Sequence, residues 1–162
     1  MRGALISLAF AGLGLAGCGF TPLYGAPGVA SSLAAISVVT PEGRAGHLIR
    51  GHLDDAFAHR RGGPAAYSME LSLGEARYPR GVRIDNVATR YEYVLTATYE
   101  LKAQPSGALA KRGSVRVELT YDSADQPYAS IAAQQDAQDR AAEEAARRIE
   151  LELAAWLAAQ RG

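Results

Sequence analysis

The stretch Arg90–Ala103, which reads RYEYVLTATYELKA, decides the fold. Its odd positions from Tyr91 to Ala103 carry tyrosine, leucine or alanine. Most of its even positions are polar: Arg90, Glu92, Thr96, Thr98, Glu100 and Lys102. This period of two predicts a long strand within residues 84–103, with one face buried and the other in water.

Two neighbouring segments repeat this alternation. Residues 67–77 carry apolar side chains at every second position up to Leu73, and residues 109–121 do so at Val115, Val117, Leu119 and Tyr121. Gln104-Pro105-Ser106-Gly107 reads as a turn, so we predict a long hairpin on either side of it. The apolar run 33–40, which ends at Pro41, predicts a shorter interior strand.

Two segments have the period of a helix. In residues 45–61 the apolar side chains recur every three or four positions, and Gly62-Gly63-Pro64 follows. Residues 128–160 are rich in alanine, glutamate and arginine, and carry three acid-first pairs four residues apart: Asp136 with Arg140, Glu143 with Arg147, and Glu144 with Arg148. The first half of this helix is weakly apolar, so we expect firm packing over residues 142–157.

The predicted order is therefore β-α-β-β-β-α. One apolar sheet face and two amphipathic helices favour an α/β (α+β) two-layer sandwich, in which two helices cover a four-stranded mixed sheet. The first two strands should be parallel, because a helix connects them, and the other pairs antiparallel. We assign this single domain to residues 33–162.

The N-terminus has the layout of an exported lipoprotein. Residues 1–17 begin with Met1, Arg2 and Gly3 and continue as an apolar run. This run is too short to span a bilayer. Leu15-Ala16-Gly17-Cys18 looks like a bacterial lipobox, in which the cysteine receives a diacylglycerol and an N-acyl chain. Residues 18–32 would then be a lipidated, extended tether, and Gly19 favours the outer membrane on its periplasmic side. An ordinary cleaved signal followed by a free thiol is the alternative.

Composition narrows the possible functions. Lysine plus arginine and aspartate plus glutamate each number 17, so the chain lacks the basic excess typical of nucleic-acid binding. Cys18 is the single cysteine, so packing alone must hold the core. No cofactor is expected apart from the covalent lipid on Cys18.

The sequence motifs give little support for a catalytic site. His52, Asp55 and His59 lie near one side of the first helix but lack the spacing of a zinc site, and we interpret them as its solvated polar face. There is no G-x-S-x-G motif and no phosphate-binding glycine loop. We therefore expect no enzyme and no metal. Tyr91, Tyr93 and Tyr99 are expected in the core or in an interface.

A local excess of arginine is the best candidate for a binding site. Arg77, Arg80, Arg83 and Arg90 occupy the predicted connection between the second and third strands and the start of the third. Arginine grips phosphate in bidentate fashion, so the four could hold an anionic lipid head group such as that of lipopolysaccharide. A solvated basic loop is the alternative. A second, weaker cluster comprises Lys102, Lys111 and Arg112.

Three segments together resemble the LPS-assembly lipoprotein family, LptE, in its alphaproteobacterial form: LAGCGFTPLYG, ATRYEYVLTATYEL and YASIAAQQDAQDRAAEEAARRIELEL. The resemblance implies a non-enzymatic lipoprotein that plugs an outer-membrane β-barrel, LptD, helps to assemble it, and contacts lipopolysaccharide. It also implies two helices on a four-stranded mixed sheet. The alternatives are a lipoprotein scaffold or auxiliary of another membrane transport complex and, least favoured, a hydrolase.

Overall fold

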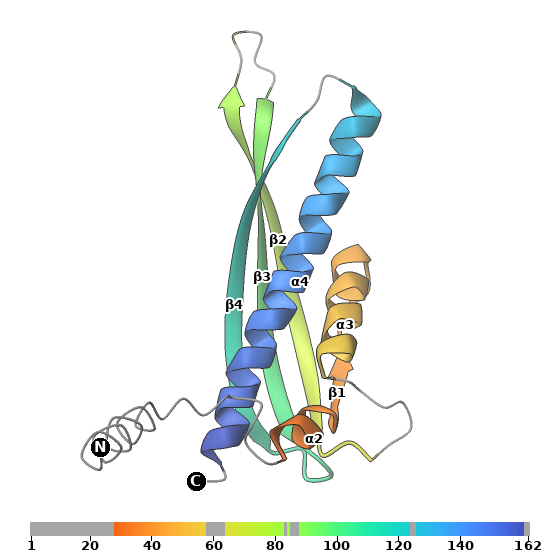
Figure 1. The fold of residues 1–162 in the computed structure, drawn as a ribbon, viewed down its shortest axis with the longest axis vertical. Coiled ribbons are helices and arrows are strands. Elements are labelled where there is room, and N and C mark those ends of the chain that lie inside the picture. The colour runs from red at the N-terminus through yellow and green to blue at the C-terminus, as the bar shows by residue number, and fades with distance from the viewer. Residues whose placement is uncertain (1–27, 58–63, 83, 85–87, 124–125, 161–162) are drawn as a thin grey trace, which may run out of the picture.

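The computed structural model describes residues 28–57, 64–82, 84, 88–123 and 126–160. The helices are α2 (Val29–Leu33), α3 (Arg44–Ala56) and α4 (Pro127–Ala159), and the strands are β1 (Ile36–Val39), β2 (Tyr67–Val82), β3 (Ala88–Ala103) and β4 (Leu109–Asp122). The strands form one sheet in the order β1-β2-β3-β4, with the helices packed against it (Figure 1). The predicted two-layer α+β fold is confirmed, with one additional short helix.

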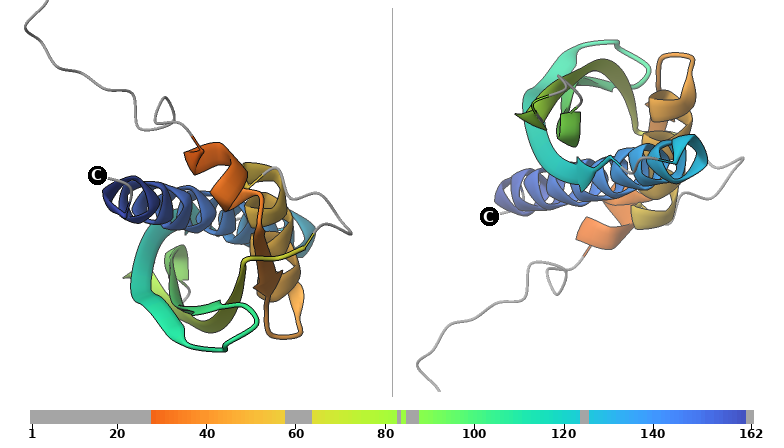
Figure 2. Two further views of the ribbon diagram at one scale, coloured as in Figure 1. Left: turned by 90° about the horizontal axis from the view of Figure 1, so that it is seen from below. Right: turned by 90° about the horizontal axis from the view of Figure 1, so that it is seen from above.

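The sheet is mixed, as predicted. β1 runs parallel to β2, with Ile36 opposite Tyr67, and the β2–β3 and β3–β4 pairs are antiparallel. Figure 2 shows that the long strands curl into an arc, that α4 lies across its open side, and that α3 lies beside β1. Odd-numbered residues of β2, β3 and β4 share the face toward the helices, so the alternation read from the sequence sets the two layers.

Part of the predicted tether is helical. Residues 18–32 were expected to be extended, but α2 occupies Val29–Leu33, and residues 18–27 lie outside the described part of the chain. Val29 and Leu33 are four residues apart, so one helical turn places both side chains in the core, where they are 0% and 2% exposed. Burial of these two side chains in the core therefore overrides the weak preference of this segment for an extended conformation.

The second strand is longer than predicted. The sequence predicts a connection at Tyr78-Pro79-Arg80-Gly81, yet β2 continues through these residues and pairs with the start of β3. Pro79 is tolerated because β1 pairs with β2 only from Tyr67 to Glu70, so beyond that point β2 is an edge strand. The third strand begins at Ala88, later than residue 84.

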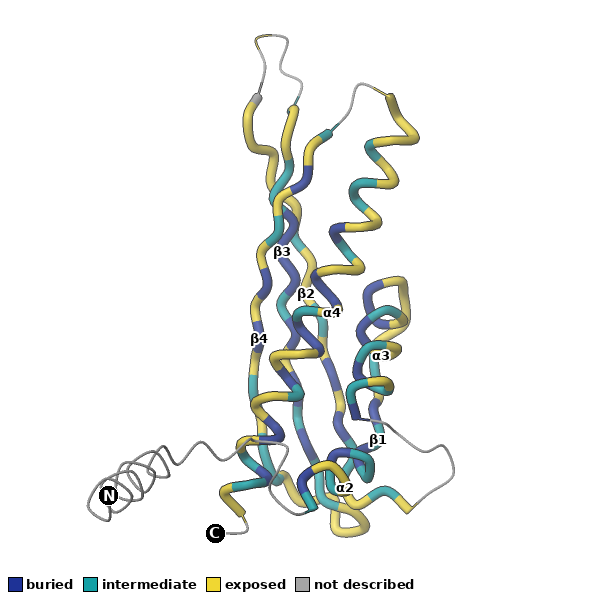
Figure 3. Tube along the Cα trace, viewed as in Figure 1, coloured by how far each residue is buried: buried dark blue, intermediate teal, exposed yellow. Residues whose placement is uncertain are grey.

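The helices match their predicted positions, with different ends. α3 ends at Ala56, and α4 is continuous over 33 residues, roughly 50 Å. The firmly packed part of α4 begins at Ala137, earlier than predicted, because alanines let the helix approach the sheet closely. Between Pro127 and Asp136, all of which the structure describes, no residue is buried, and this end of α4 is mostly exposed in Figure 3.

The core lies between the helix-facing side of the sheet and the packed parts of α3 and α4. Its largest fully buried side chains include Tyr99 of β3, Phe57 after α3, and Ile149 and Leu153 of α4. Tyr93 is buried too and Tyr91 packs partly buried against the core, so the predicted placement of the β3 tyrosines is confirmed. Among the described residues, no helix is long and apolar enough to cross a membrane.

Candidate functional site

The face of the sheet turned away from the helices is polar and electrically balanced. Its even-numbered side chains include five basic residues, each within 4 Å of a carboxylate. The pairs are Arg80–Glu92, Arg90–Asp122, Lys102–Glu70, Arg112–Glu100 and Arg116–Glu118. The hydrogen bond that Lys102 Nζ donates to the Glu70 carboxylate raises the pKa of Lys102. The described part of this face therefore carries charge without a net excess of either sign.

Small hydroxyl side chains occupy the middle of this polar face. Thr98 of β3 and Ser114 of β4 lie opposite each other and share a hydrogen bond of 3.2 Å between their side-chain oxygens. Val94 is an apolar exception at 2% exposure, on a face that the sequence pattern predicts to be wet. The result is a surface with ion pairs toward both ends and, in the middle, hydroxyl groups beside the Arg116–Glu118 pair.

Two of the predicted site arginines lie on this face, directly opposite each other. Arg80 on β2 faces Arg90 on β3, and together with Gly81, Thr89 and Asp122 they line a hollow of about 500 Å³. The Thr89 hydroxyl donates a 2.6 Å hydrogen bond to the carbonyl of Gly81, which fixes the bend there, where φ is +62°.

Both arginines already have carboxylate partners. Arg80 Nε donates to Glu92 Oε2 at 2.9 Å, and Arg90 Nε donates to Asp122 Oδ1 at 2.8 Å. Both guanidinium groups are more than half exposed, so these ion pairs contribute little to stability. A phosphate could therefore displace a carboxylate at small cost.

The third arginine lies on the opposite face. Arg77 is on the helix-facing side of β2, where its guanidinium lies 4.7 Å from the centre of the Tyr91 ring and donates a 2.7 Å hydrogen bond to Gln134 of α4. Tyr91 in turn stacks on Tyr121. The strand alternation thus separates Arg77 from Arg80 and Arg90, and Arg83 lies outside the described residues, as does Cys18.

Polar contacts hold the first half of α4 to the sheet. The Tyr93 hydroxyl donates to Glu75 at 2.6 Å, and Gln138 of α4 donates to the same carboxylate at 3.4 Å. Ser123 and Ser130 share a 3.1 Å hydrogen bond across the turn into α4. Among the described residues, the buried Tyr121 hydroxyl has no hydrogen-bond partner. The sequence pattern does not predict these polar contacts.

Three of the remaining predicted residues, Lys102, Arg112 and His52, have structural partners. Lys102 and Arg112 of the weaker basic cluster are paired with Glu70 and Glu100, at the end of β3 far from Arg90. His52 lies 3.0 Å from Asp139 of α4 and so links α3 to α4. Within the described part of the chain, no group of three His, Cys, Asp or Glu side chains could hold a metal, and His59 is outside it.

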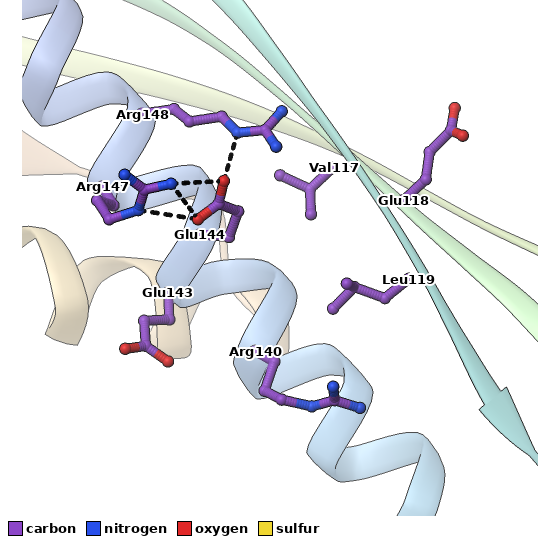
Figure 4. Close-up of a pocket in the computed structure, with 8 residues that line it drawn as sticks. All are labelled: Val117, Glu118, Leu119, Arg140, Glu143, Glu144, Arg147 and Arg148. Atoms are coloured by element: carbon purple, nitrogen blue, oxygen red, sulfur yellow. Dashed lines mark hydrogen bonds and ion pairs between the residues drawn. The ribbon is translucent and has the colours of Figure 1, made fainter.

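A groove between β4 and α4 was also missed from the sequence (Figure 4). It has a volume of about 430 Å³ and is lined by Val117, Glu118, Leu119, Arg140, Glu143, Glu144, Arg147 and Arg148. Glu144 accepts hydrogen bonds from Arg147 and Arg148, which lower the pKa of its carboxyl. The predicted Asp136–Arg140 and Glu144–Arg148 pairs form, whereas Arg147 binds Glu144 instead of Glu143. The regular spacing of charged residues along α4 was the sequence pattern that could have indicated this groove.

Known proteins share this fold and part of this sequence. A family model described as LptE, lipopolysaccharide assembly, matches residues 32–153. A candidate lipoprotein from Caulobacter crescentus CB15 is 56% identical, with a TM-score of 0.73 over 82% of this chain and 97% of that one. Among curated proteins, none matches the chain.

Two more distant solved structures show the same fold. Rare lipoprotein B from Shewanella oneidensis is 13% identical, with a TM-score of 0.60 over 78% of this chain and 97% of that one. Lipoprotein B from Nitrosomonas europaea is 12% identical, with a TM-score of 0.58 over 76% of this chain and 84% of that one. Because the family model spans most of the chain, this protein belongs to the LptE family of lipopolysaccharide-assembly proteins.

Proposed function

We propose that this chain is a non-enzymatic lipoprotein of the outer membrane, anchored on the periplasmic side by acyl groups on Cys18. In this proposal it plugs an LptD-type β-barrel, helps that barrel to assemble, and assists the transport of lipopolysaccharide to the cell surface. Membership of the family supports the role in lipopolysaccharide assembly. The proposal adds to this role a specific partner, the LptD-type barrel, and a specific location, the outer membrane.

The polar face of the sheet is the observation that carries the plug function. The lumen of a large outer-membrane barrel is polar, so a plug needs a rigid surface of hydrogen-bonding groups without a large net charge. Five ion pairs and the hydroxyl groups of Thr98 and Ser114 supply such a surface. The core behind it fixes the positions of these groups.

Lipopolysaccharide phosphate would bind at Arg80 and Arg90. A phosphate would replace Glu92 or Asp122 and accept bidentate hydrogen bonds from the two facing guanidinium groups. Arg83, a predicted member of this site, lies outside the described residues, and Arg77 lies on the other face of β2, against Tyr91 and Gln134. The tether would join the domain at α2, at the end of the molecule opposite to Arg80 and Arg90 (Figure 1).

Cross-linking tests the barrel partner. A photoreactive amino acid at Thr98, in the middle of the polar face, should form an adduct with an LptD-type barrel in intact cells. The same group at His47, exposed on α3, is the matched control. A different transport protein as the adduct would favour the auxiliary role, and an intact barrel without an adduct would remove the plug proposal.

The lipid anchor is tested separately. A Cys18→Ser chain lacks the acyl acceptor but keeps the whole domain. We expect it to fold normally and still co-purify with the barrel, while the yield of assembled barrel falls, because the anchor raises the local concentration near the membrane. Equal barrel assembly with and without the anchor would contradict this role.

Charge reversal tests the phosphate site. Arg80→Glu with Arg83→Glu should weaken binding of purified lipopolysaccharide without altering the unfolding curve. Arg50→Glu on α3, which also breaks an exposed ion pair, is the control. Lipopolysaccharide binding unchanged by the first pair of substitutions would exclude this site but leave the barrel partnership untouched.

A further inference from the structure

The first half of α4, residues 127–136, is weakly attached to the sheet. Ser130 shares a 3.1 Å hydrogen bond with Ser123, just after β4, and Gln134 accepts a 2.7 Å hydrogen bond from Arg77 of β2. The structure describes this whole segment, and none of its residues is buried (Figure 3); Ala133 packs half-buried against the core. Segments with few buried contacts open most easily, so these two hydrogen bonds provide much of the attachment.

Both hydrogen bonds reach the sheet beside the hollow described above. Ser123 directly follows Asp122, which lines the hollow. The guanidinium of Arg77 lies 4.7 Å from the ring centre of Tyr91, and Tyr91 directly follows Arg90, another residue of the hollow. The hollow on the polar face and the contacts of α4 on the helix-facing side therefore lie back to back on the same end of the sheet.

A continuous set of hydrogen bonds joins the hollow to α4. The Thr89 hydroxyl donates to the carbonyl of Gly81 at 2.6 Å, and both residues line the hollow. The Thr89 carbonyl accepts a 2.8 Å hydrogen bond from the amide of Ser123, whose side chain contacts Ser130 of α4. Contiguous contacts of this kind carry coupling between separate sites. A movement at the end of β4 would thus reach α4 directly.

The Arg90–Asp122 ion pair holds the end of β4. Arg90 Nε donates to Asp122 Oδ1 at 2.8 Å across the β3–β4 pair. A phosphate in the hollow would bind the Arg90 guanidinium and repel the freed Asp122 carboxylate, because both groups are negatively charged. The end of β4 would then lose part of its attachment to β3, and Ser123 would no longer be held in place for Ser130.

Tyr121 makes the attached position of α4 less stable than it would otherwise be. The residue lies on the helix-facing side of β4, is 6% exposed and stacks on Tyr91. Its hydroxyl has no hydrogen-bond partner among the described residues, and a buried hydroxyl without a partner destabilises the state that buries it. Release of α4 would admit water to this hydroxyl, which offsets part of the cost of release.

We propose that residues 127–136 of α4 form a latch. The latch is attached to the sheet while Arg90 pairs with Asp122, and it is released when an anion in the hollow takes Arg90. This inference rests on the anion site proposed above and adds that the site controls a helix on the opposite face of the sheet. Because coupling between two equilibria is reciprocal, a latch that cannot open must weaken binding of the anion.

A disulfide across the contact between Ser123 and Ser130 tests this reciprocity. The full chain carries Ser123→Cys and Ser130→Cys, together with Cys18→Ser so that no third thiol is present, and inorganic pyrophosphate is the probe. Titration calorimetry measures its affinity. Oxidation of the two thiols should weaken pyrophosphate binding about fivefold or more, and reduction of the same sample should restore it.

The matched control is a disulfide between Thr98→Cys and Ser114→Cys, whose native hydroxyls lie 3.2 Å apart on the polar face, away from α4. Its oxidation should leave the affinity for pyrophosphate unchanged. Equal affinity of the oxidised and reduced Ser123→Cys, Ser130→Cys chain, or an equal loss in the control, would overturn the latch and leave the anion site in place. No pyrophosphate binding by the reduced chain, or binding that Arg80→Glu does not weaken, would remove both the anion site and the latch.

Amide hydrogen exchange tests the latch without a ligand or a disulfide. Asp122→Ala removes the partner of Arg90 and should speed exchange at residues 131–136 about threefold, the change that loss of an exposed ion pair supports, while residues after Ala137 keep their protection. Glu100→Ala, which breaks the β3–β4 pair with Arg112 at the other end of the sheet, is the matched control and should leave this exchange unchanged. Wild-type exchange at residues 131–136 in Asp122→Ala would overturn the latch.

Discussion

Gly113 of β4 lies directly opposite Tyr99 of β3, and the missing side chain at Gly113 gives the Tyr99 ring its place in the core. A Cβ atom at residue 113 would lie 2.5 Å from both Cζ and the hydroxyl oxygen of Tyr99. The ring is fully buried, and its hydroxyl donates a 2.7 Å hydrogen bond to Glu152 of α4. A glycine in one strand thus lets an aromatic residue of the next connect the sheet to the helix.

Replacement of that glycine should destabilise the domain. Gly113→Ala pushes a methyl group into the ring, and overpacking of this kind costs about 1–3 kcal/mol. Urea unfolding measures the loss. Gly51→Ala in α3 is the control: its added Cβ meets nothing within 4 Å, and alanine should stabilise the helix by about 0.5–1 kcal/mol. An undiminished free energy of unfolding for Gly113→Ala would contradict the ring placement.

Alkaline pH should unfold the protein through two tyrosines. Burial raises the pKa of Tyr93 and Tyr99, and their hydrogen bonds to Glu75 and Glu152 raise it further. An unfolded tyrosine titrates near pH 10, so the folded state holds these protons more tightly. The stabilisation they give is therefore complete below about pH 10 and is lost as the pH rises through the folded-state pKa.

Urea unfolding at a series of alkaline pH values tests this dependence. The wild-type free energy of unfolding should fall above about pH 10. The double variant Tyr93→Phe, Tyr99→Phe should show a flatter pH dependence. Tyr128→Phe, at an exposed position on α4, should retain the wild-type slope. Equal slopes for all three proteins would rule out these two hydroxyls as the source.

The two ends of α4 should respond differently to truncation. Leu153→Ala removes a fully buried side chain and should cost about 2–5 kcal/mol. Ile131→Ala, at 53% exposure, should change stability by less than about 0.5 kcal/mol. Amide hydrogen exchange should also be faster before Ala137 than after it, because the first part of the helix buries no side chain. Uniform protection along α4 would contradict this division.

Arg77 should not tolerate lysine. Its planar guanidinium stacks on Tyr91 and donates to Gln134, and an ammonium group lacks this flat shape. Arg77→Lys should lower the free energy of unfolding by about 0.5–1 kcal/mol. Arg50→Lys, at an exposed site with a single ion pair, is the matched control and should have no measurable effect. Equal stability of the two variants would show that the stack contributes nothing.

The sequence predicted the fold well because periodicity is a local property. Alternation along β2, β3 and β4 identified the helix-facing side chains, and the turn at residues 104–107 identified the hairpin. The parallel β1–β2 pair followed from the intervening helix. The weakest predictions concerned segments whose structure depends on distant partners, namely α2 and the extension of β2 past Pro79.

The prediction that grouped Arg77, Arg80 and Arg90 into one site was inaccurate for a different reason. Arg77, Arg80 and Arg90 are close in sequence, and antiparallel pairing does bring Arg80 beside Arg90. Their grouping by charge alone ignored the face on which each residue lies. Had the strand been extended past Tyr78, the odd number of Arg77 would have assigned it to the helix layer and the even numbers of Arg80 and Arg90 to the polar face.

By itself, the sequence determined the element types, their order, the two faces of the sheet and the resemblance to the LptE family, because these depend on local patterns. Only the tertiary structure decided which charges meet. Glu92 and Asp122 neutralise Arg80 and Arg90, Arg148 reaches the edge of β4, and Gly113 makes room for Tyr99. Each of these contacts joins different strands, or a strand and a helix, so strand register and helix placement fix them rather than local sequence.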